Sequence, residues 1–187
     1  MIRLPLKLLS ALVLAVAAVF TVKPGFAQSY DRPTIEIRDI FGPSRPPTLV
    51  RENLWRSGRP TEQILQDLYS QGVRIIINLE DNEQQAPIEA AWAKRIGFTY
   101  YAFPLNSYMQ PDDQTIDQIL AILTRAQAPV LVHCYHGEDR TGLVIGLERV
   151  FIEGWTAQKA YDEMLSMGFH QILFGLDQYF HDKVRGH

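Results

Sequence analysis

The sequence predicts an α/β fold with a mostly parallel central sheet that is flanked by helices on both faces. Three short segments, 74–79, 98–103 and 129–132, have the apolar, β-branched and aromatic content of buried strands. Segments with apolar residues at helical spacing separate these strands and follow the last one. Strands that alternate with helices are typical of parallel sheets, because each helical crossover covers one face of the sheet.

The first 27 residues have the pattern of a signal peptide. Arg3 and Lys7 precede an apolar run from Leu8 to Val22, and small residues lie just before Gln28. An uncleaved membrane anchor is the alternative, but the run is shorter than the ~20 residues of a membrane-spanning helix, and Pro24 follows it. We expect a secreted or periplasmic bacterial protein with no stable membrane insertion after cleavage.

The charge of the chain limits its partners. Removal of residues 1–27 takes away three basic side chains and no acidic one, so the formal net charge falls from −3 to −6. A nucleic-acid-binding domain would show a basic stripe instead, so we expect no nucleic-acid partner. The remaining length is that of one domain with its own core.

Residues 28–50 are expected to form an extended N-terminal arm ahead of a single domain at 51–187. The arm contains Pro33, Pro43, Pro46 and Pro47, and only residues 34–37 suggest a strand.

The elements of the domain follow in order. Thr61 can cap a first helix, whose apolar stripe is Ile64, Leu65, Leu68 and Tyr69 and which Gly72 ends. Strand 74–79 comes next, and the acidic residues after it, Asp81, Glu83 and Glu89, are expected to form a solvated loop with no role in binding a metal.

Later helices show the same periodicity. Helix 87–96 is expected to bury Ile88, Ala91, Trp92 and Ile96, and strand 98–103 follows it. Helix 111–123 is expected to bury Ile116, Ile119, Leu120 and Leu123. After strand 129–132, three further helices are expected near 142–151, 156–167 and 172–181.

The segment from His133 to Gly142 holds the residues with the clearest chemical meaning. It contains the only cysteine, Cys134, and Arg140 follows after five intervening residues, in a loop between a strand and a helix. Such a loop can point successive backbone N–H groups at one phosphate, and the planar fork of Arg140 can bind two phosphate oxygens. The positive end of the helix dipole favours the thiolate form of Cys134 at neutral pH.

The other residues of this loop complete the predicted phosphate site. Gly137 permits the tight backbone curvature. Thr141 can donate its hydroxyl proton to the sulfur, and His133 is expected to orient the loop. The predicted phosphate-binding residues are Tyr135, His136, Gly137, Glu138, Asp139 and Arg140.

Two other interpretations of the cysteine are weaker. A lone cysteine is usually a small buried hydrophobe, but that role needs no loop that ends in an arginine. His133, Cys134 and His136 could bind a metal, but one short segment without a second ligand pair is poor zinc spacing. We therefore expect no metal and no other cofactor.

The segment His133–Gly142 resembles the signature of the cysteine-dependent protein-tyrosine and dual-specificity phosphatase superfamily. Segments 54–60, 72–79 and 101–105 resemble further landmarks of its small bacterial members, so the resemblance runs from about Leu54 to the C-terminus. It implies the fold of these phosphatases and a phosphocysteine intermediate on Cys134. The implied partner is a phosphorylated substrate, either a phosphotyrosine protein or an inositol phosphate.

The general acid departs from the family pattern. The family has an aspartate in an upstream loop, where Asn106 and Ser107 stand here. Asp139 is the preferred substitute, because repulsion by a bound phosphate would favour its protonated form. Asp112 and Asp113 are the alternatives, although carboxylates there also suit a helix N-terminus.

Three functions remain open from the sequence. A displaced acid penalises alkyl phosphates more than aryl phosphates, which favours phosphotyrosine. An inositol polyphosphate phosphatase of the phytase type is the second, if Arg56, Arg59, Lys94 and Arg95 form a basic rim. The third is a phosphate-binding module without turnover, which the presence of both Cys134 and Arg140 disfavours.

Overall fold

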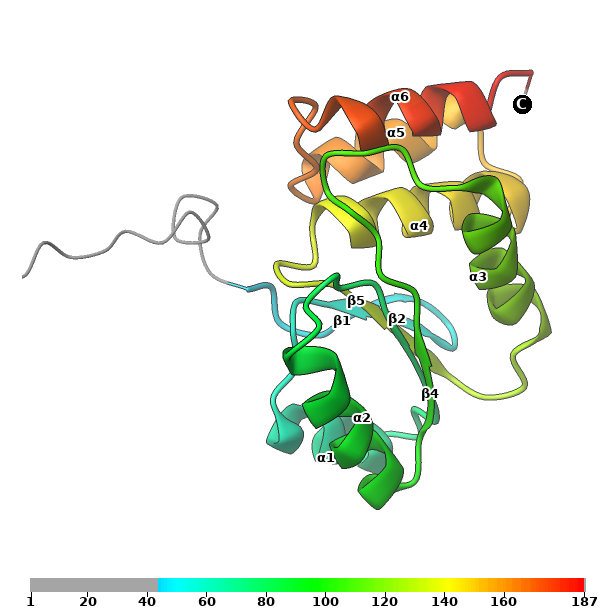
Figure 1. Ribbon diagram of the computed structural model, residues 1–187. Helices are drawn as coiled ribbons and strands as arrows, with labels where there is room; N and C mark the ends of the chain where they lie inside the picture. Colours follow the sequence, from blue (N-terminus) through cyan, green and yellow to red (C-terminus); the bar gives the residue numbers. More distant parts are fainter. Residues whose placement is uncertain (1–43, 187) are drawn as a thin grey trace, which may run out of the picture. The chain divides into compact units, whose positions relative to one another are not determined.

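The computed structural model describes residues 44–186, which form one five-stranded sheet and six helices (Figure 1). The predicted signal peptide and all but the last seven residues of the predicted arm lie outside this range. In the described part of the chain, no helix is long and apolar enough to cross a bilayer. Across the sheet the strands lie in the order β1 (Thr48–Arg51), β2 (Leu54–Ser57), β5 (Val130–His133), β3 (Ile75–Asn78) and β4 (Thr99–Ala102). The predicted α/β class with a mostly parallel sheet is confirmed.

An antiparallel hairpin, which was not predicted, forms one edge of the sheet. Strand β1 (Thr48–Arg51) pairs with β2 (Leu54–Ser57), and only two residues connect them. Asn53 in this turn has φ 66°, a left-handed conformation that asparagine tolerates better than most residues. Part of the predicted arm therefore belongs to the sheet.

The other strands run parallel to β2. Strand β5 (Val130–His133) lies between β2 and β3 (Ile75–Asn78), and β4 (Thr99–Ala102) forms the far edge. Side chains of β5 alternate between the two hydrophobic clusters that cover the sheet, with Val132 in one and Leu131 in the other. Burial on both faces explains why the strands read as continuous apolar runs.

Two helices cover one face of the sheet. Helices α1 (Glu62–Ser70) and α2 (Gln85–Ile96) pack against each other, and α2 also packs against β4 (Figure 1). Their cluster combines Leu65 and Leu68 of α1 and Ala93 of α2 with Ile76 and Leu131 of the sheet.

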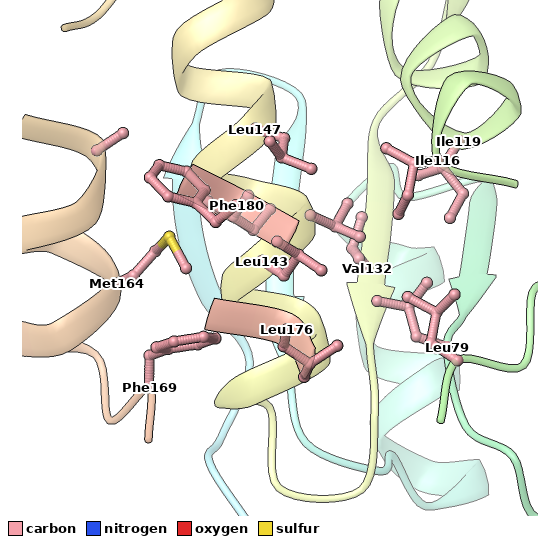
Figure 2. Close-up of a cluster of buried hydrophobic side chains, with 14 of the residues drawn as sticks. Leu79, Ile116, Ile119, Val132, Leu143, Leu147, Met164, Phe169, Leu176 and Phe180 are labelled. Carbon is pink, nitrogen blue, oxygen red and sulfur yellow. The ribbon is translucent and has the colours of Figure 1, made fainter. Parts of the chain in front are cut away.

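Four helices lie on the other side of the sheet, α3 (Asp113–Arg125), α4 (Asp139–Phe151), α5 (Ala157–Ser166) and α6 (Phe174–Lys183), and α5 and α6 pack against α4 (Figure 1). Figure 2 shows the cluster between them and the sheet, where side chains of all four helices meet residues of β5 and of the segment after β3. Its labelled members include Leu79, Ile116, Val132, Leu143, Met164 and Phe180.

Helix α4 is the centre of this layer. It contacts α3, α5 and α6, and its residues from Arg140 to Val150 are all buried. Three of them are charged, and two of these bind the hairpin: Glu148 accepts a hydrogen bond from Arg51 Nε at 2.7 Å, and Arg149 Nη2 donates to Val50 O at 3.1 Å. The hairpin is thereby attached to the helix that begins at the cysteine loop.

The predicted cap of α1 and the predicted apolar faces of α1 and α3 are confirmed. Thr61, Asp112 and Thr156 accept hydrogen bonds from backbone N–H groups of the first turns of α1, α3 and α5. Helix α4 begins at Asp139, three residues before the predicted start.

The predicted buried face of α2 was partly wrong. Ile88 is 47% exposed and Ala91 is exposed, whereas Glu89 and Ala93 are fully buried. Glu89 is therefore no part of a solvated loop. It turns inward because the sheet offers it polar partners, which apolar periodicity cannot reveal.

Candidate active site

The cysteine loop lies at the carboxyl end of a central strand. His133 is the last residue of β5, and its neighbours in register are Ser57 of β2 and Asn78 of β3. Cys134 follows, and the loop enters α4 at Asp139. The predicted strand–loop–helix setting is therefore present, with the helix N-terminus at the loop.

Cys134 lies at the bottom of this loop with its thiol largely covered. It is 2% exposed, and Gly137 N donates a hydrogen bond to Cys134 Sγ at 3.3 Å. A backbone N–H group directed at sulfur stabilises negative charge there, as a nucleophilic thiolate requires.

The carbonyl groups of the loop point away from its centre, because neighbouring segments bind them from outside. Tyr135 O accepts hydrogen bonds from Arg59 N at 2.9 Å and from the hydroxyl of Ser44. His136 O accepts one from Arg45 N at 2.9 Å. The segment just before β1 and the segment just after β2 thus hold the outer side of the loop.

Gly137 completes this arrangement. Its carbonyl oxygen accepts a hydrogen bond from Arg56 Nη2 at 2.7 Å. In a trans peptide the C=O and the following N–H point in opposite directions, so outward carbonyls of residues 135–137 direct the N–H groups of residues 136–138 inward. The Gly137 N–H that reaches Cys134 is one of these.

Arg56 is a buried cation that contacts the loop at Gly137. It is 4% exposed, and burial lowers the pKa of its guanidinium from its usual value, while the negative charge of Cys134 works in the opposite direction. The backbone around Gly137 leaves no room for a side chain, because a Cβ on Gly137 would lie 2.5 Å from Gly58 N. Gly137 also has φ 81°, so glycine is required both for conformation and for space.

Arg140 lies in the first turn of α4 and is 8% exposed. Its Nη1 atom donates to Asp81 Oδ1 at 2.7 Å and to Leu105 O at 3.3 Å. Asp81 follows β3 and Leu105 follows β4, so the segments after two neighbouring strands position this guanidinium. Asp81 was not predicted to take part in the site.

His133 is held by a buried polar network. Its Nε2 atom lies 2.7 Å from Glu89 Oε1, and both side chains are fully buried. Asn78 Nδ2 donates to Glu89 Oε2 at 3.3 Å and to the hydroxyl of Tyr100 at 2.8 Å. The predicted orienting role of His133 has this geometric basis, and Glu89 is the partner that the sequence did not reveal.

Two side chains of the loop have polar atoms without a partner among the described residues. Thr141 Oγ1 is buried and forms no hydrogen bond in this part of the chain, which leaves its hydroxyl available for the sulfur. Glu138 is 7% exposed, and its Oε1 atom accepts from Arg45 Nε at 2.8 Å, whereas Oε2 has no partner there. Arg45 is therefore the counter-charge of a carboxylate inside the predicted phosphate site.

Asp139 is bound by the segment between α5 and α6. Its Oδ1 atom accepts from His170 N at 2.8 Å and lies 2.9 Å from His170 Nδ1. The proposed acid therefore contacts a histidine in this structure, and its role in proton transfer stays a prediction.

The two alternative acids have other partners. Asp112 accepts hydrogen bonds from Thr115 N and from the Thr115 hydroxyl, which lower the pKa of its carboxyl. Hydrogen bonds from Lys183 and Tyr179 lower the pKa of Asp113. A lowered pKa makes a carboxyl group a poorer general acid at neutral pH.

At the family position of the acid, Asn106 Oδ1 accepts a hydrogen bond from Tyr108 N at 2.8 Å. Asn106 thus stabilises a turn in the loop between β4 and α3, next to the half-buried Ser107.

The four basic residues considered for a rim have separate roles. Arg56 lies beneath the loop, and Arg59 binds both carboxylate oxygens of Glu80 and lies 4.5 Å from the centre of the Tyr135 ring. Arg95 pairs with Glu62 of α1, and Lys94 is exposed in the last turn of α2. Arg56, Arg59 and Arg95 thus have partners within the protein, and a basic rim made of these four residues stays a hypothesis. Across residues 44–186, no group of three or more His, Cys, Asp or Glu side chains is placed to hold a metal ion.

The sequence contains only weak signals for three residues that contact the site, Arg45, Asp81 and Glu89. Arg45 and Asp81 are charged residues in segments that look like ordinary loops, and Glu89 is a charged residue in an amphipathic helix. Only their pairing with Glu138, Arg140 and His133 reveals them, and such pairs are separated by 44 to 93 residues.

Known proteins share this fold and signature. Residues 45–178 match the family model described as "Tyrosine phosphatase family". The dual specificity protein phosphatase TpbA of Pseudomonas aeruginosa is 29% identical over 154 residues, which cover 80% of this chain and 62% of that protein. Inositol diphosphatase DSP4 of Arabidopsis thaliana is 28% identical over 130 residues, which cover 67% and 65%. The match thus spans less than two thirds of these relatives.

Solved structures of other proteins have the same fold. The crystal structure of P. aeruginosa TpbA superposes with a TM-score of 0.63 at 25% identity, over 75% of this chain and 89% of that one. A variant of TpbA was crystallised in complex with pTyr. The core catalytic domain of the S. cerevisiae PP-IP phosphatase SIW14 shares the fold, with a TM-score of 0.60 at 21% identity over 76% and 90% of the two chains.

Residues 45–178 are more than half of the chain and include all five strands, Cys134 and Arg140, so the chain belongs to the tyrosine phosphatase family.

Proposed function

We propose that this protein is a cysteine-dependent phosphomonoesterase that prefers phosphotyrosine and other aryl phosphates. The observation that carries the proposal is the loop itself. Its carbonyl groups are bound from outside, its N–H groups face inward, Cys134 lies at the bottom, and Arg140 lies at the start of the helix. Such a loop stabilises the equatorial oxygens of a phosphoryl group in transfer.

The proposed reaction has two steps. Cys134 Sγ forms a bond to phosphorus while the bond from phosphorus to the ester oxygen breaks, and a protonated carboxyl group supplies a proton to the departing oxygen. Water then attacks phosphorus and gives a proton to the same carboxylate while the bond from phosphorus to sulfur breaks. The sulfur leaves as a thiolate, and the Thr141 hydroxyl can donate a hydrogen bond to it. Arg140 binds two phosphate oxygens in both steps.

Two carboxyl groups are the candidates for the acid. Asp139 is adjacent to Arg140 in sequence, as predicted, and Asp81 is in direct contact with its guanidinium. A bound phosphate dianion repels a carboxylate and thereby favours its protonated form. Because Asn106 and Ser107 cannot act as the acid, basic alkoxide leaving groups are expected to depart slowly, which favours the less basic phenolate of tyrosine.

The complex of TpbA with pTyr supports phosphotyrosine as the substrate. Relatives named inositol diphosphatases support an inositol phosphate as the second candidate. The roles found for Arg56, Arg59 and Arg95 favour phosphotyrosine, because a polyphosphate needs several cations around the site. We further propose that the protein is exported, on the pattern of residues 1–27, which predicts that its mature form begins at Gln28.

The test compares wild type with Cys134→Ser, Asp81→Asn and Asp139→Asn on a series of aryl and alkyl phosphates, a phosphotyrosine peptide and phytate, with chelator present. Wild type should turn over the aryl esters and the peptide fastest, and Cys134→Ser should be inactive. The variant that lacks the acid should lose more activity as the leaving group becomes more basic, whereas a positioning residue should lose the same factor throughout. Faster turnover of phytate than of the peptide would contradict the substrate assignment.

A further inference from the structure

A groove of about 540 Å³ opens beside the cysteine loop. It lies between the segment after β3, the first turns of α2, and β4 (Figure 1). Asp81 lines this groove and also contacts Arg140, so one guanidinium separates the groove from the phosphate site. Leu79, just before the groove segment, donates its N–H to the carbonyl oxygen of His133, just before Cys134, at 2.9 Å.

The floor of the groove is apolar. Ala86, Pro87 and Ala90 of α2 line one side, and Tyr100 and Ala102 of β4 line the other. Burial raises the pKa of the Tyr100 hydroxyl far above its usual value, so the ring stays neutral. A hydrocarbon chain can lie on such a surface without loss of hydrogen bonds.

The rim of the groove is acidic. Glu80, Asp81 and Glu83 all line it. Glu80 is compensated by Arg59, which binds both of its oxygens. Glu83 is exposed, and the side chain of Asp81 is 49% exposed. These two carboxylates are the ones that can meet a ligand.

The charge of this rim is coupled to occupancy of the phosphate site. In the present structure Arg140 Nη1 binds Asp81. A phosphoryl dianion in the loop competes for the same guanidinium. Binding of the phosphate therefore weakens the contact between Arg140 and Asp81, which leaves the Asp81 carboxyl group beside Glu83 to meet the rest of the substrate.

We propose that this groove binds the side chain of a lysine or arginine that lies within two residues of the phosphotyrosine in a peptide substrate. This inference rests on the proposed function and specifies its substrate class. The hydrocarbon stem lies on the floor formed by Ala90 and Tyr100, and the cationic tip contacts Asp81 and Glu83. An acidic residue at that place meets like charge and is rejected.

The test uses phosphotyrosine peptides that differ at one position, scanned over two residues on each side of the phosphotyrosine. The position carries lysine, its uncharged analogue norleucine, or glutamate. At one position at least, kcat/KM of the full-length protein should be about fivefold higher for lysine than for norleucine, and lowest for glutamate. This preference should shrink at high salt. Equal rates for lysine and norleucine at every position would overturn the proposal.

Two variants locate the effect. Glu83→Gln should reduce the ratio between lysine and norleucine peptides by about threefold, whereas Glu52→Gln, which removes an exposed carboxylate in the β1–β2 turn, should leave the ratio unchanged. Ala90→Phe, which fills the floor, should lower kcat/KM for the lysine and norleucine peptides alike. If the ratio is the same in Glu83→Gln and wild type, the groove is not the binding site.

A small aryl phosphate without a peptide separates this inference from the proposed function. Glu83→Gln and Ala90→Phe should hydrolyse it at the wild-type rate, which also shows that both variants are folded. If wild type hydrolyses neither the aryl phosphate nor any peptide, the proposed function fails. If wild type hydrolyses both without a lysine preference, only the groove inference fails.

Discussion

Arg140 Nη1 lies 2.7 Å from Asp81 Oδ1, so the arginine expected to bind phosphate already holds a carboxylate. The two residues are 59 positions apart and come from α4 and the segment after β3. A bound phosphate therefore competes with Asp81 for the positive charge of Arg140.

The first prediction follows from this competition. Asp81→Asn should bind the oxyanions phosphate and vanadate about threefold more tightly, because Arg140 no longer has an anionic partner. The inhibition constants in an aryl phosphate assay measure this. Glu83→Gln, in the same loop but without contact to Arg140, is the control. Weaker inhibition of Asp81→Asn would instead show that Asp81 orients the arginine for the phosphate.

A second prediction concerns Gly137. Gly137→Ala should abolish activity, because a Cβ would lie 2.5 Å from Gly58 N and the residue has φ 81°. Gly72 has φ 98° with nothing within 4 Å of the corresponding Cβ, so Gly72→Ala tests strain without a clash. It should cost about 1 kcal/mol of unfolding free energy and leave kcat/KM unchanged. Activity in Gly137→Ala would mean that the loop tolerates a different path.

A third prediction concerns the counter-charge of the loop. Arg45→Met leaves the buried Glu138 carboxylate without its cation, so KM for an aryl phosphate should rise about tenfold. Glu138→Gln in the same chain removes the repulsive charge and should restore most of the loss, which a double-mutant cycle detects. Additive effects of the two substitutions would show that the Arg45 side chain acts independently of Glu138.

A fourth prediction concerns pH and Glu148. Burial raises the pKa of this carboxyl, and the hydrogen bond from Arg51 opposes the shift only in part. The folded state therefore binds a proton more tightly than the unfolded state, so this group stabilises the fold increasingly as pH falls and ceases to do so above its folded pKa. Relative to Glu148→Gln, wild type should gain unfolding free energy from about pH 7 to about pH 5 in urea titrations. A difference independent of pH would contradict the shift.

Sequence reasoning captured the parts of this fold that repeat along the chain. Periodicity predicts strands β3, β4 and β5 and the apolar faces of α1 and α3. Apolar side chains such as Leu65 and Ile116 are buried when these faces pack against the sheet. The loop around Cys134 could also be predicted, since its residues are contiguous in the sequence.

What the sequence did not reveal depends on pairs of distant charges. Glu89 was expected in a solvated loop, yet it is buried in α2 because His133 and Asn78 satisfy its oxygens. Asp81 and Arg45 looked like loop charges, yet each neutralises a residue of the cysteine loop. The hairpin turn at Asn53 also carried no glycine to mark it.

The central claim is that Cys134 becomes covalently phosphorylated. The most direct measurement is mass spectrometry of the protein quenched in acid during turnover of an aryl phosphate, with chelator present. We expect one added phosphoryl group on the peptide that contains Cys134, and none in Cys134→Ser, which should bind the substrate without releasing product. Product release by Cys134→Ser at the wild-type rate would contradict the mechanism.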